Sequence, residues 1–243
     1  MVDEGRIMKI TLLANGSSGR ERLIRRWGVS FLIGDEVLFD TFGDAAVFLK
    51  NLRKFGVDLA KIKHIVLSHD HWDHVTGLWS IAEACSNASV YICPHFSPEI
   101  KAKAASLHLK VVESSATPIA LTAGVSTTGE ICGEFNGKTA YEQAIVVQSP
   151  QGLIVLVGCA HPGLANMLRW VQKAFNNQPL HMLVGGFHLR DMRSEAIEQV
   201  IAELKTLGVQ NISPMHCTGR LATRLMKQTF GQCFMQLREG QIF

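Results

Sequence analysis

The sequence has no uninterrupted apolar stretch near the roughly 18 residues that a membrane-spanning helix needs. It also has no Cys-x-x-Cys pair, and its six cysteines are scattered along 243 residues. Disulfide frameworks are typical of much smaller secreted chains, so this pattern predicts reduced thiols. Residues 1–5 are polar and acidic, unlike a secretory signal. We therefore expect a cytoplasmic protein that does not span a membrane.

The chain has little excess charge of either sign. A net charge of +3 at pH 7 is too small to indicate nucleic-acid binding. Basic residues concentrate in 20–26, which is either a solvated face or a patch that attracts an anionic substrate. With 47% hydrophobic and 19% charged residues, the composition is that of a globular protein with an ample core. No linker or low-complexity segment interrupts it, which predicts a single domain over residues 1–243.

The most informative stretch contains the pattern His-x-His-x-Asp-His, formed by His69, His71, Asp73 and His74. A short apolar run precedes it. Alternate residues of an extended segment share a face, so a strand ending here would place His69 beside His71. Neutral imidazoles with a carboxylate suit zinc, iron or manganese. Without a cation, so many polar groups beside a strand end would be costly to desolvate, so the pattern predicts a metal site.

Three further apolar segments each lead into a turn that carries histidine. Segments 152–163, 182–189 and 211–219 carry, in that order, Cys159 with His161, His188, and His216. The first of these turns is expected to enter a helix near Pro162, because proline favours the first helical position. Polar residues at such strand-to-helix turns are typical of ligand sites in open sheets. The pattern predicts strands first, then alternating strands and helices.

With these motifs the sequence resembles the metallo-β-lactamase superfamily. Within it, the resemblance is greatest to the dihydropterin-methyl-ribofuranosylaminobenzene phosphate synthase-like subfamily. The similarity runs from about residue 10 to the C-terminus and includes the segments 141–144, 158–163, 185–189 and 216–219. It implies an α+β fold, the αββα four-layer sandwich, with two mixed β-sheets, helices outside, and a dinuclear metal site at one edge.

The resemblance also implies the metal ligands. They are His69, His71, Asp73, His74, His161 and His216. These would hold two divalent transition-metal ions, with zinc favoured and iron or manganese as alternatives. Many relatives have Gly-Asp where this chain has Gly-Cys, so either Cys159 or His161 must replace the bridging aspartate. A separate histidine that usually precedes this strand is missing, and that region offers only Glu130.

Two other acids lie near the pattern without matching it. Asp40 is expected to orient a ligand, and Asp70 either to do the same or to cap a helix. In the predicted chemistry Asp73 ligates a metal and orients the activated water. His188 is expected to contact substrate, donate a proton or serve as a further ligand. The Gly/Ser-containing loop 15–19 could cradle a phosphate through backbone amides.

These features predict a metal-dependent hydrolase of a phosphoester or other anionic small molecule. The subfamily's role in pterin biosynthesis implies an alternative, a synthase that forms a C–N bond with loss of pyrophosphate. A second alternative is a metal-loaded sensing or binding module without turnover. We expect no nucleic-acid or membrane partner, and the sequence leaves the oligomeric state open.

Overall fold

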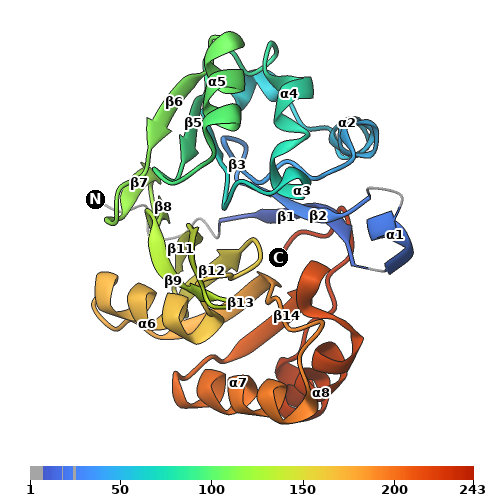
Figure 1. Cartoon of the computed structure of the whole chain (residues 1–243), viewed down its shortest axis with the longest axis vertical. Coiled ribbons are helices and arrows are strands. Elements are labelled where there is room, and N and C mark those ends of the chain that lie inside the picture. The colour runs from blue at the N-terminus through green and yellow to red at the C-terminus, as the bar shows by residue number, and fades with distance from the viewer. Residues whose placement is uncertain (1–7, 18, 24–25) are drawn as a thin grey trace.

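A computed structural model describes residues 8–17, 19–23 and 26–243. Two six-stranded sheets pack face to face, and helices cover both outer faces (Figure 1). The predicted αββα four-layer sandwich is confirmed. Three expectations fall partly or wholly outside the described residues: the acidic segment 1–5, position 18 of the loop 15–19, and positions 24–25 of the basic stretch.

The first sheet contains six strands that lie side by side in chain order. They are β1 (Ile10–Gly16), β2 (Gly28–Ile33), β3 (Val37–Phe39), β4 (His64–Val66), β5 (Ser89–Ile92) and β6 (Lys110–Glu113). β1 to β3 are antiparallel, and β3 to β6 run parallel. Side chains alternate between faces: Ile65 and Leu67 pack toward the outer helices, whereas Val66 packs toward the second sheet.

The outer face of the first sheet packs against helices that contain residues 45–54, 78–81 and 98–106 (Figure 1). The helical segments are α1 (Gly19–Leu23), α2 (Ala45–Lys54), η1 (Leu59–Lys61), α3 (Trp72–Val75), α4 (Leu78–Ile81) and α5 (Pro98–Ser106). The α2 helix begins at Asp44, whose side chain accepts a hydrogen bond from the Val47 amide. It buries Phe48 and Leu52 against the sheet.

The second sheet has the order β14-β13-β12-β11-β8-β7. Its strands are β7 (Ile119–Thr122), β8 (Val125–Thr127), β11 (Ile145–Ser149), β12 (Gly152–Val157), β13 (Leu180–Gly186) and β14 (Asn211–Met215). β12 to β14 run parallel, and the remaining pairs are antiparallel. A separate hairpin is formed by β9 (Ile131–Phe135) and β10 (Lys138–Glu142).

The outer face of the second sheet packs against α6, α7 and α8 (Figure 1). The helical segments here are α6 (Leu164–Ala174), α7 (Ser194–Thr206), η2 (His216–Thr218), α8 (Arg220–Phe230) and η3 (Gly231–Cys233). The helix expected near Pro162 is present, but α6 begins at Leu164, so Pro162 lies in the preceding turn and not at the first helical position. Gly163 has φ +92°, so the turn continues past the proline before the helix starts. No helix in the described ranges is both long and apolar enough to cross a membrane.

The loops that follow β4, β12, β13 and β14 meet at one edge of the sandwich. Between the sheets lies an apolar layer that includes Phe31 and Phe39. At the edge, Gln143 joins the two halves: its backbone amide donates to the Ser68 carbonyl at 2.9 Å, and its side-chain amide donates to the Leu67 carbonyl at 2.8 Å. The motif loop is thereby fixed relative to the second sheet.

Candidate metal centre

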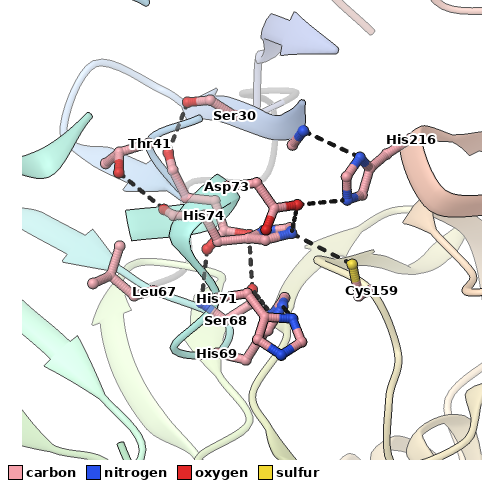
Figure 2. Close-up of polar contacts among 12 residues, drawn as sticks. Ser30, Thr41, Leu67, Ser68, His69, His71, Asp73, His74, Cys159 and His216 are labelled. Atoms are coloured by element: carbon pink, nitrogen blue, oxygen red, sulfur yellow. Dashed lines mark hydrogen bonds and ion pairs between the residues drawn. The ribbon is translucent and has the colours of Figure 1, made fainter. Parts of the chain in front are cut away.

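The His-x-His-x-Asp-His pattern occupies one continuous loop after β4. His69 and His71 lie in the extended part, and Asp73 and His74 lie on the single turn of α3. Three of the four side chains are buried, and only His71 is exposed. Figure 2 shows the four side chains converging with His216 and Cys159 from the other half of the chain. The predicted ligands of the motif are thus brought together.

These side chains form two compact groups, each of which combines both halves of the chain. The ligand atoms of His69, His71 and His161 lie within 4.8 Å of one another. The same holds for a group formed by Asp73, His74 and His216.

Short distances within each group bring ring nitrogens and carboxylate oxygens together. His69 Nε2 lies 3.1 Å from His71 Nδ1. Asp73 Oδ2 lies 3.4 Å from His74 Nε2 and 3.3 Å from His216 Nε2 (Figure 2). We refer to these sets as the first and second ligand groups.

In the first half of the chain, Asp40 fixes the orientation of the His74 ring directly and that of the His69 ring through Ser68. Its Oδ2 lies 2.6 Å from His74 Nδ1, and its carboxylate also accepts the backbone amide and hydroxyl of Ser68 at 2.7 and 2.8 Å. Because the Ser68 hydroxyl donates to Asp40, it accepts from His69 Nδ1 at 2.8 Å. Both imidazoles are therefore held at Nδ1 and present Nε2 to the ligand groups, as metal-bound histidines do.

The pKa values of His69 and His74 are shifted in opposite directions. Burial, together with the surrounding imidazoles, holds the pKa of His69 well below its ordinary value. Burial alone would also lower the pKa of His74, but the carboxylates of Asp40 and Asp73 raise it well above its ordinary value. Burial would raise the pKa of Asp73, yet His74 and His216 hold it well below its usual range. A cluster with this charge distribution carries an ionised carboxylate at its centre.

In the second half of the chain, the orienting role falls to Glu142, which sequence reasoning did not single out. Its buried carboxylate accepts the backbone amides of Cys159, Ala160 and His161 at 2.8, 2.9 and 3.0 Å. It also lies 3.1 Å from His161 Nδ1, which leaves Nε2 facing the first ligand group. Burial opposes ionisation, but these contacts lower the pKa of Glu142 to about 2. The available signal was the segment 141–144, which carries part of the family resemblance and contains Glu142 as its one acid.

Both candidates for the missing bridging aspartate lie at the cluster. His161 belongs to the first ligand group. The sulfur of Cys159 lies 3.4 Å from His74 Nε2 and also groups with His69. The turn after β12 therefore supplies two donors of different chemistry, a thiol and an imidazole.

Two other acids considered from the sequence do not reach the cluster. Glu130 Oε1 lies 2.8 Å from His95 Nδ1, and His95 stacks on Tyr141. Asp70 accepts the backbone amide of Ser97 at 3.0 Å, and Ser97 is the N-cap of α5. Ser97 itself caps the helix by accepting the Ile100 amide, and Asp70 supports that cap by accepting the Ser97 amide. Asp70 makes no hydrogen bond to a cluster histidine among the described residues, although its negative charge opposes the lowering of the His71 pKa.

His188 lies beside the cluster, at the end of β13. Its ring centroid is 4.5 Å from that of His161 and 4.6 Å from that of Phe135. Its backbone amide donates to the sulfur of Cys217 at 3.3 Å. Burial would lower the pKa of His188, but the thiol of Cys217 and nearby carboxylates raise it.

Several buried ring nitrogens at this edge have no hydrogen-bond partner among the described residues. They are His161 Nε2, His188 Nδ1 and His216 Nε2. The last of these lies near Asp73 but outside hydrogen-bond geometry. Unpaired buried polar atoms are costly and uncommon. Imidazole nitrogens that converge with a carboxylate and a thiol are the donor set that divalent transition metals prefer, so these residues fit such ions.

Backbone strain gathers at the same edge. Asp40, Ala160, His188 and His216 have φ between +50° and +60°. Positive φ is uncommon for residues other than glycine, and such strain persists where the surrounding structure fixes it, often at functional sites. Their own contacts hold Asp40 and Ala160 in place, the latter through Glu142. The backbone amides of His188 and His216 donate to Cys217 Sγ and Asn15 Oδ1.

Comparisons with known proteins agree with this geometry. The family described as the metallo-beta-lactamase superfamily matches residues 28–113. A curated relative from Methanocaldococcus jannaschii, named 7,8-dihydropterin-6-methyl-4-(beta-D-ribofuranosyl)-aminobenzene-5'-phosphate synthase, is 30% identical, with 88% of each chain covered. The structure of Tm1679, called a metal-dependent hydrolase of the beta-lactamase superfamily, is 27% identical over 98% of each chain, with a TM-score of 0.77. YhfI from Bacillus subtilis, with a TM-score of 0.70 over 97% of this chain and 98% of its own, shares the fold at 14% identity.

Proposed function

Because this chain belongs to the metallo-β-lactamase superfamily, we propose that it is a metal-dependent hydrolase of a phosphoester or other anionic small molecule. The observation that carries the proposal is the pair of compact ligand groups at one edge of the sandwich. We propose two divalent transition-metal ions, with zinc favoured by the histidine-rich donor set. The six free cysteines support a reducing, cytoplasmic environment, which is also a proposal.

Each ligand group would hold one ion. His69, His71 and His161 form the first set, and Asp73, His74 and His216 form the second. Cys159 lies where a donor to the second set would be needed in place of the usual aspartate. When bound, such ions lower the pKa of water toward about 7 and stabilise negative charge that develops on oxygen.

Residues of the chain itself orient the histidine ligands and donate a proton in the proposed reaction. Asp40 and Glu142 hold the Nδ1 atoms of His74 and His161, which keeps each Nε2 directed into the cluster. Asp73 contributes a carboxylate that stays ionised, since its pKa lies well below the usual range. We assign proton donation to His188, because its raised pKa favours the protonated ring and its buried Nδ1 has no partner among the described residues.

A second candidate is supported by the relative from Methanocaldococcus jannaschii, which is named a synthase. Applied to this chain, that name suggests a reaction that forms a C–N bond between a dihydropterin methyl carbon and the amine of an aminobenzene ring that carries a ribose phosphate, with pyrophosphate leaving from the pterin partner. The same cluster suits it, because charge on departing phosphate oxygens would need the same stabilisation. A non-catalytic metal-binding module remains the third candidate.

One experiment separates the three candidates. Metal content per chain is measured on protein reconstituted with zinc, iron or manganese, and release of phosphate from phosphoesters is assayed beside release of pyrophosphate from a diphosphate ester with an amine acceptor. His69→Ala serves as the loss variant, and His181→Ala, whose ring contacts Gln210 outside the cluster, serves as the control.

The proposal predicts two ions and phosphoester hydrolysis that His69→Ala abolishes and His181→Ala leaves intact. Pyrophosphate release without hydrolysis would favour the synthase. Two ions without either activity would favour the module, and failure to retain any metal would overturn all three candidates.

A further inference from the structure

A basic cavity of about 530 Å³ opens between the N-terminal loop and the turns after β13 and β14. Its polar lining consists of Ser17, Arg20, Arg190, Asp191 and Arg220. Three guanidinium groups face one carboxylate, so the lining carries a clear positive excess. We call this site the arginine cavity.

The arginine cavity adjoins the second ligand group through one aromatic side chain. The Arg190 guanidinium carbon lies 4.9 Å from the ring centroid of Trp27, and the Trp27 ring lies 4.6 Å from that of His216. Trp27 is buried, so it fixes the separation between the cavity and the cluster. Arg190 also follows His188 by only two residues. The arginine cavity therefore lies next to the second ligand group, with the Trp27 ring between Arg190 and His216.

Arg190 packs against Trp27, but its guanidinium group forms no ion pair among the described residues. Its Nη1 atom is buried and has no hydrogen-bond partner among the described residues. A buried guanidinium nitrogen without an acceptor is costly, which points to an acceptor supplied by a ligand. The stack on Trp27 satisfies the flat face of the guanidinium and leaves its edge for such an acceptor.

The first turn of α8 adds a second kind of donor. This 11-residue helix begins at Arg220, its first turn contains no acidic residue, and no side chain caps it among the described residues. Free amides and the helix dipole favour an anion there. The preceding Gly219 has φ +83°, and a Cβ atom would lie 2.6 Å from Arg190 Cα. Glycine therefore allows Arg190 to approach the start of the helix.

We propose that the arginine cavity binds a phosphate monoester group of the substrate, at a position separate from the bond that reacts at the metal cluster. This inference rests on the proposed function. Guanidinium groups bind phosphate through paired, charge-assisted hydrogen bonds, and a dianion matches the excess positive charge left after Asp191 is counted.

Two segments considered from the sequence reach this cavity. The loop 15–19 contributes Ser17, but the Ser17 backbone amide donates to Glu21 Oε2 at 2.9 Å and so is not free to cradle phosphate as expected. The basic stretch 20–26, considered as an anion-attracting patch, contributes Arg20. Arg26, at the other end of that stretch, instead forms an ion pair with Asp44 at 3.5 Å. The functional interpretation of the basic stretch therefore applies to Arg20 and not to Arg26.

The test is calorimetric titration of inorganic phosphate into metal-loaded protein at constant ionic strength. Arg190→Gln and Arg220→Gln should each weaken binding about tenfold or more, because each removes a charge-assisted contact. Arg224→Gln is the matched control, since this exposed arginine lies on α8 outside the cavity lining. Arg220 is exposed as well, so its substitution should leave folding intact, and Arg190→Lys tests whether charge without the planar fork suffices.

A second titration uses chelator-treated protein shown to be folded by circular dichroism. Phosphate binding that persists there and responds to the arginine substitutions supports the cavity. Unchanged affinity in both glutamine variants, or phosphate binding only to metal-loaded protein, would overturn it.

Metal content separates this inference from the proposed function. Protein that binds phosphate through the arginines but holds no metal would contradict the proposed metal-dependent activity and still support the phosphate site in the arginine cavity. Chain that holds two ions and turns over, with phosphate binding insensitive to both arginines, would contradict the cavity alone.

Discussion

The two halves of the molecule contribute to the metal cluster in different ways. The first half supplies four ligands from one continuous loop, 69–74, after a single strand. The second half supplies His161 and His216 from the ends of two different strands. Each ligand group takes two residues from the first half and one from the second, so neither half completes a group alone. A contiguous motif can be read directly, whereas a dispersed one depends on how the strands are ordered.

The largest effect should come from removing one ligand of the first group from each half. His71→Ala and His161→Ala should each lose one of the two ions, and activity should fall by about 10³-fold, because an ion that stabilises charge contributes several kcal/mol. Metal analysis per chain and turnover measure both effects, with His181→Ala as the control. If His161→Ala keeps both ions, the second half does not share the first group.

The two orienting carboxylates give a closer comparison. Asp40 holds His74 in the first half, and Glu142 holds His161 in the second. Replacing either with its amide should lower metal affinity about 10- to 100-fold, because the histidine loses its fixed orientation. Competition with a chromophoric chelator measures the affinity, and Glu203→Gln, an exposed acid paired with Arg169, is the control. Equal affinity in Glu142→Gln and wild type would show that the turn after β12 holds His161 without its carboxylate.

Sequence reasoning recovered the first half of the cluster from local spacing and the fold from the resemblance to a known family. In the loop after β4, spacing alone places His69 beside His71, and the following single turn brings Asp73 and His74 to the same edge. The strand and helix pattern predicted only strands first, followed by alternating strands and helices. The two sheets with helices outside were implied by the resemblance to the metallo-β-lactamase superfamily, and the structure confirms them.

The second half was harder to predict because its contacts join distant positions. Glu142 binds amides 17 to 19 residues further along the chain, and no local pattern marks that pairing. The turn after β12 is also longer than expected: Ala160 and Gly163 have positive φ, so α6 starts after Pro162. This geometry brings both Cys159 and His161 to the cluster, where spacing alone left their roles open.

Low pH should affect the two orienting carboxylates differently in the metal-free protein. The pKa of Glu142 is lowered from 4.5 to about 2 in the folded state, so its ionised form stabilises the fold above about pH 4.5. That stabilisation, about 3 kcal/mol, should be lost as the pH falls from about 4.5 to about 2. Burial raises the pKa of Asp40 instead. The Asp40→Asn variant should therefore still lose stability as the pH falls, whereas the Glu142→Gln variant should not show the part of that loss that comes from Glu142.

Urea unfolding at a series of pH values measures this difference. The free energy of unfolding of wild type and Asp40→Asn should decline across the window, while that of Glu142→Gln should decline less. Parallel curves for wild type and Glu142→Gln would contradict the assignment of this stabilisation to Glu142.

The smallest effect separates two neighbouring thiols of the second half. Cys159 and Cys217 lie with their sulfurs 3.3 Å apart, but only Cys159 contacts a histidine of the first half, with its sulfur 3.4 Å from His74 Nε2. In cobalt-substituted protein, Cys159→Ser should therefore lose any thiolate-to-metal charge-transfer absorption and weaken metal binding up to about tenfold. Cys217→Ser should keep the absorption and change affinity less than about threefold. Loss of the band in both variants would instead extend the metal site to Cys217 and His188, the third set of donors at this edge. The second half would then form a donor set of its own, and its contribution would no longer be one residue for each ligand group.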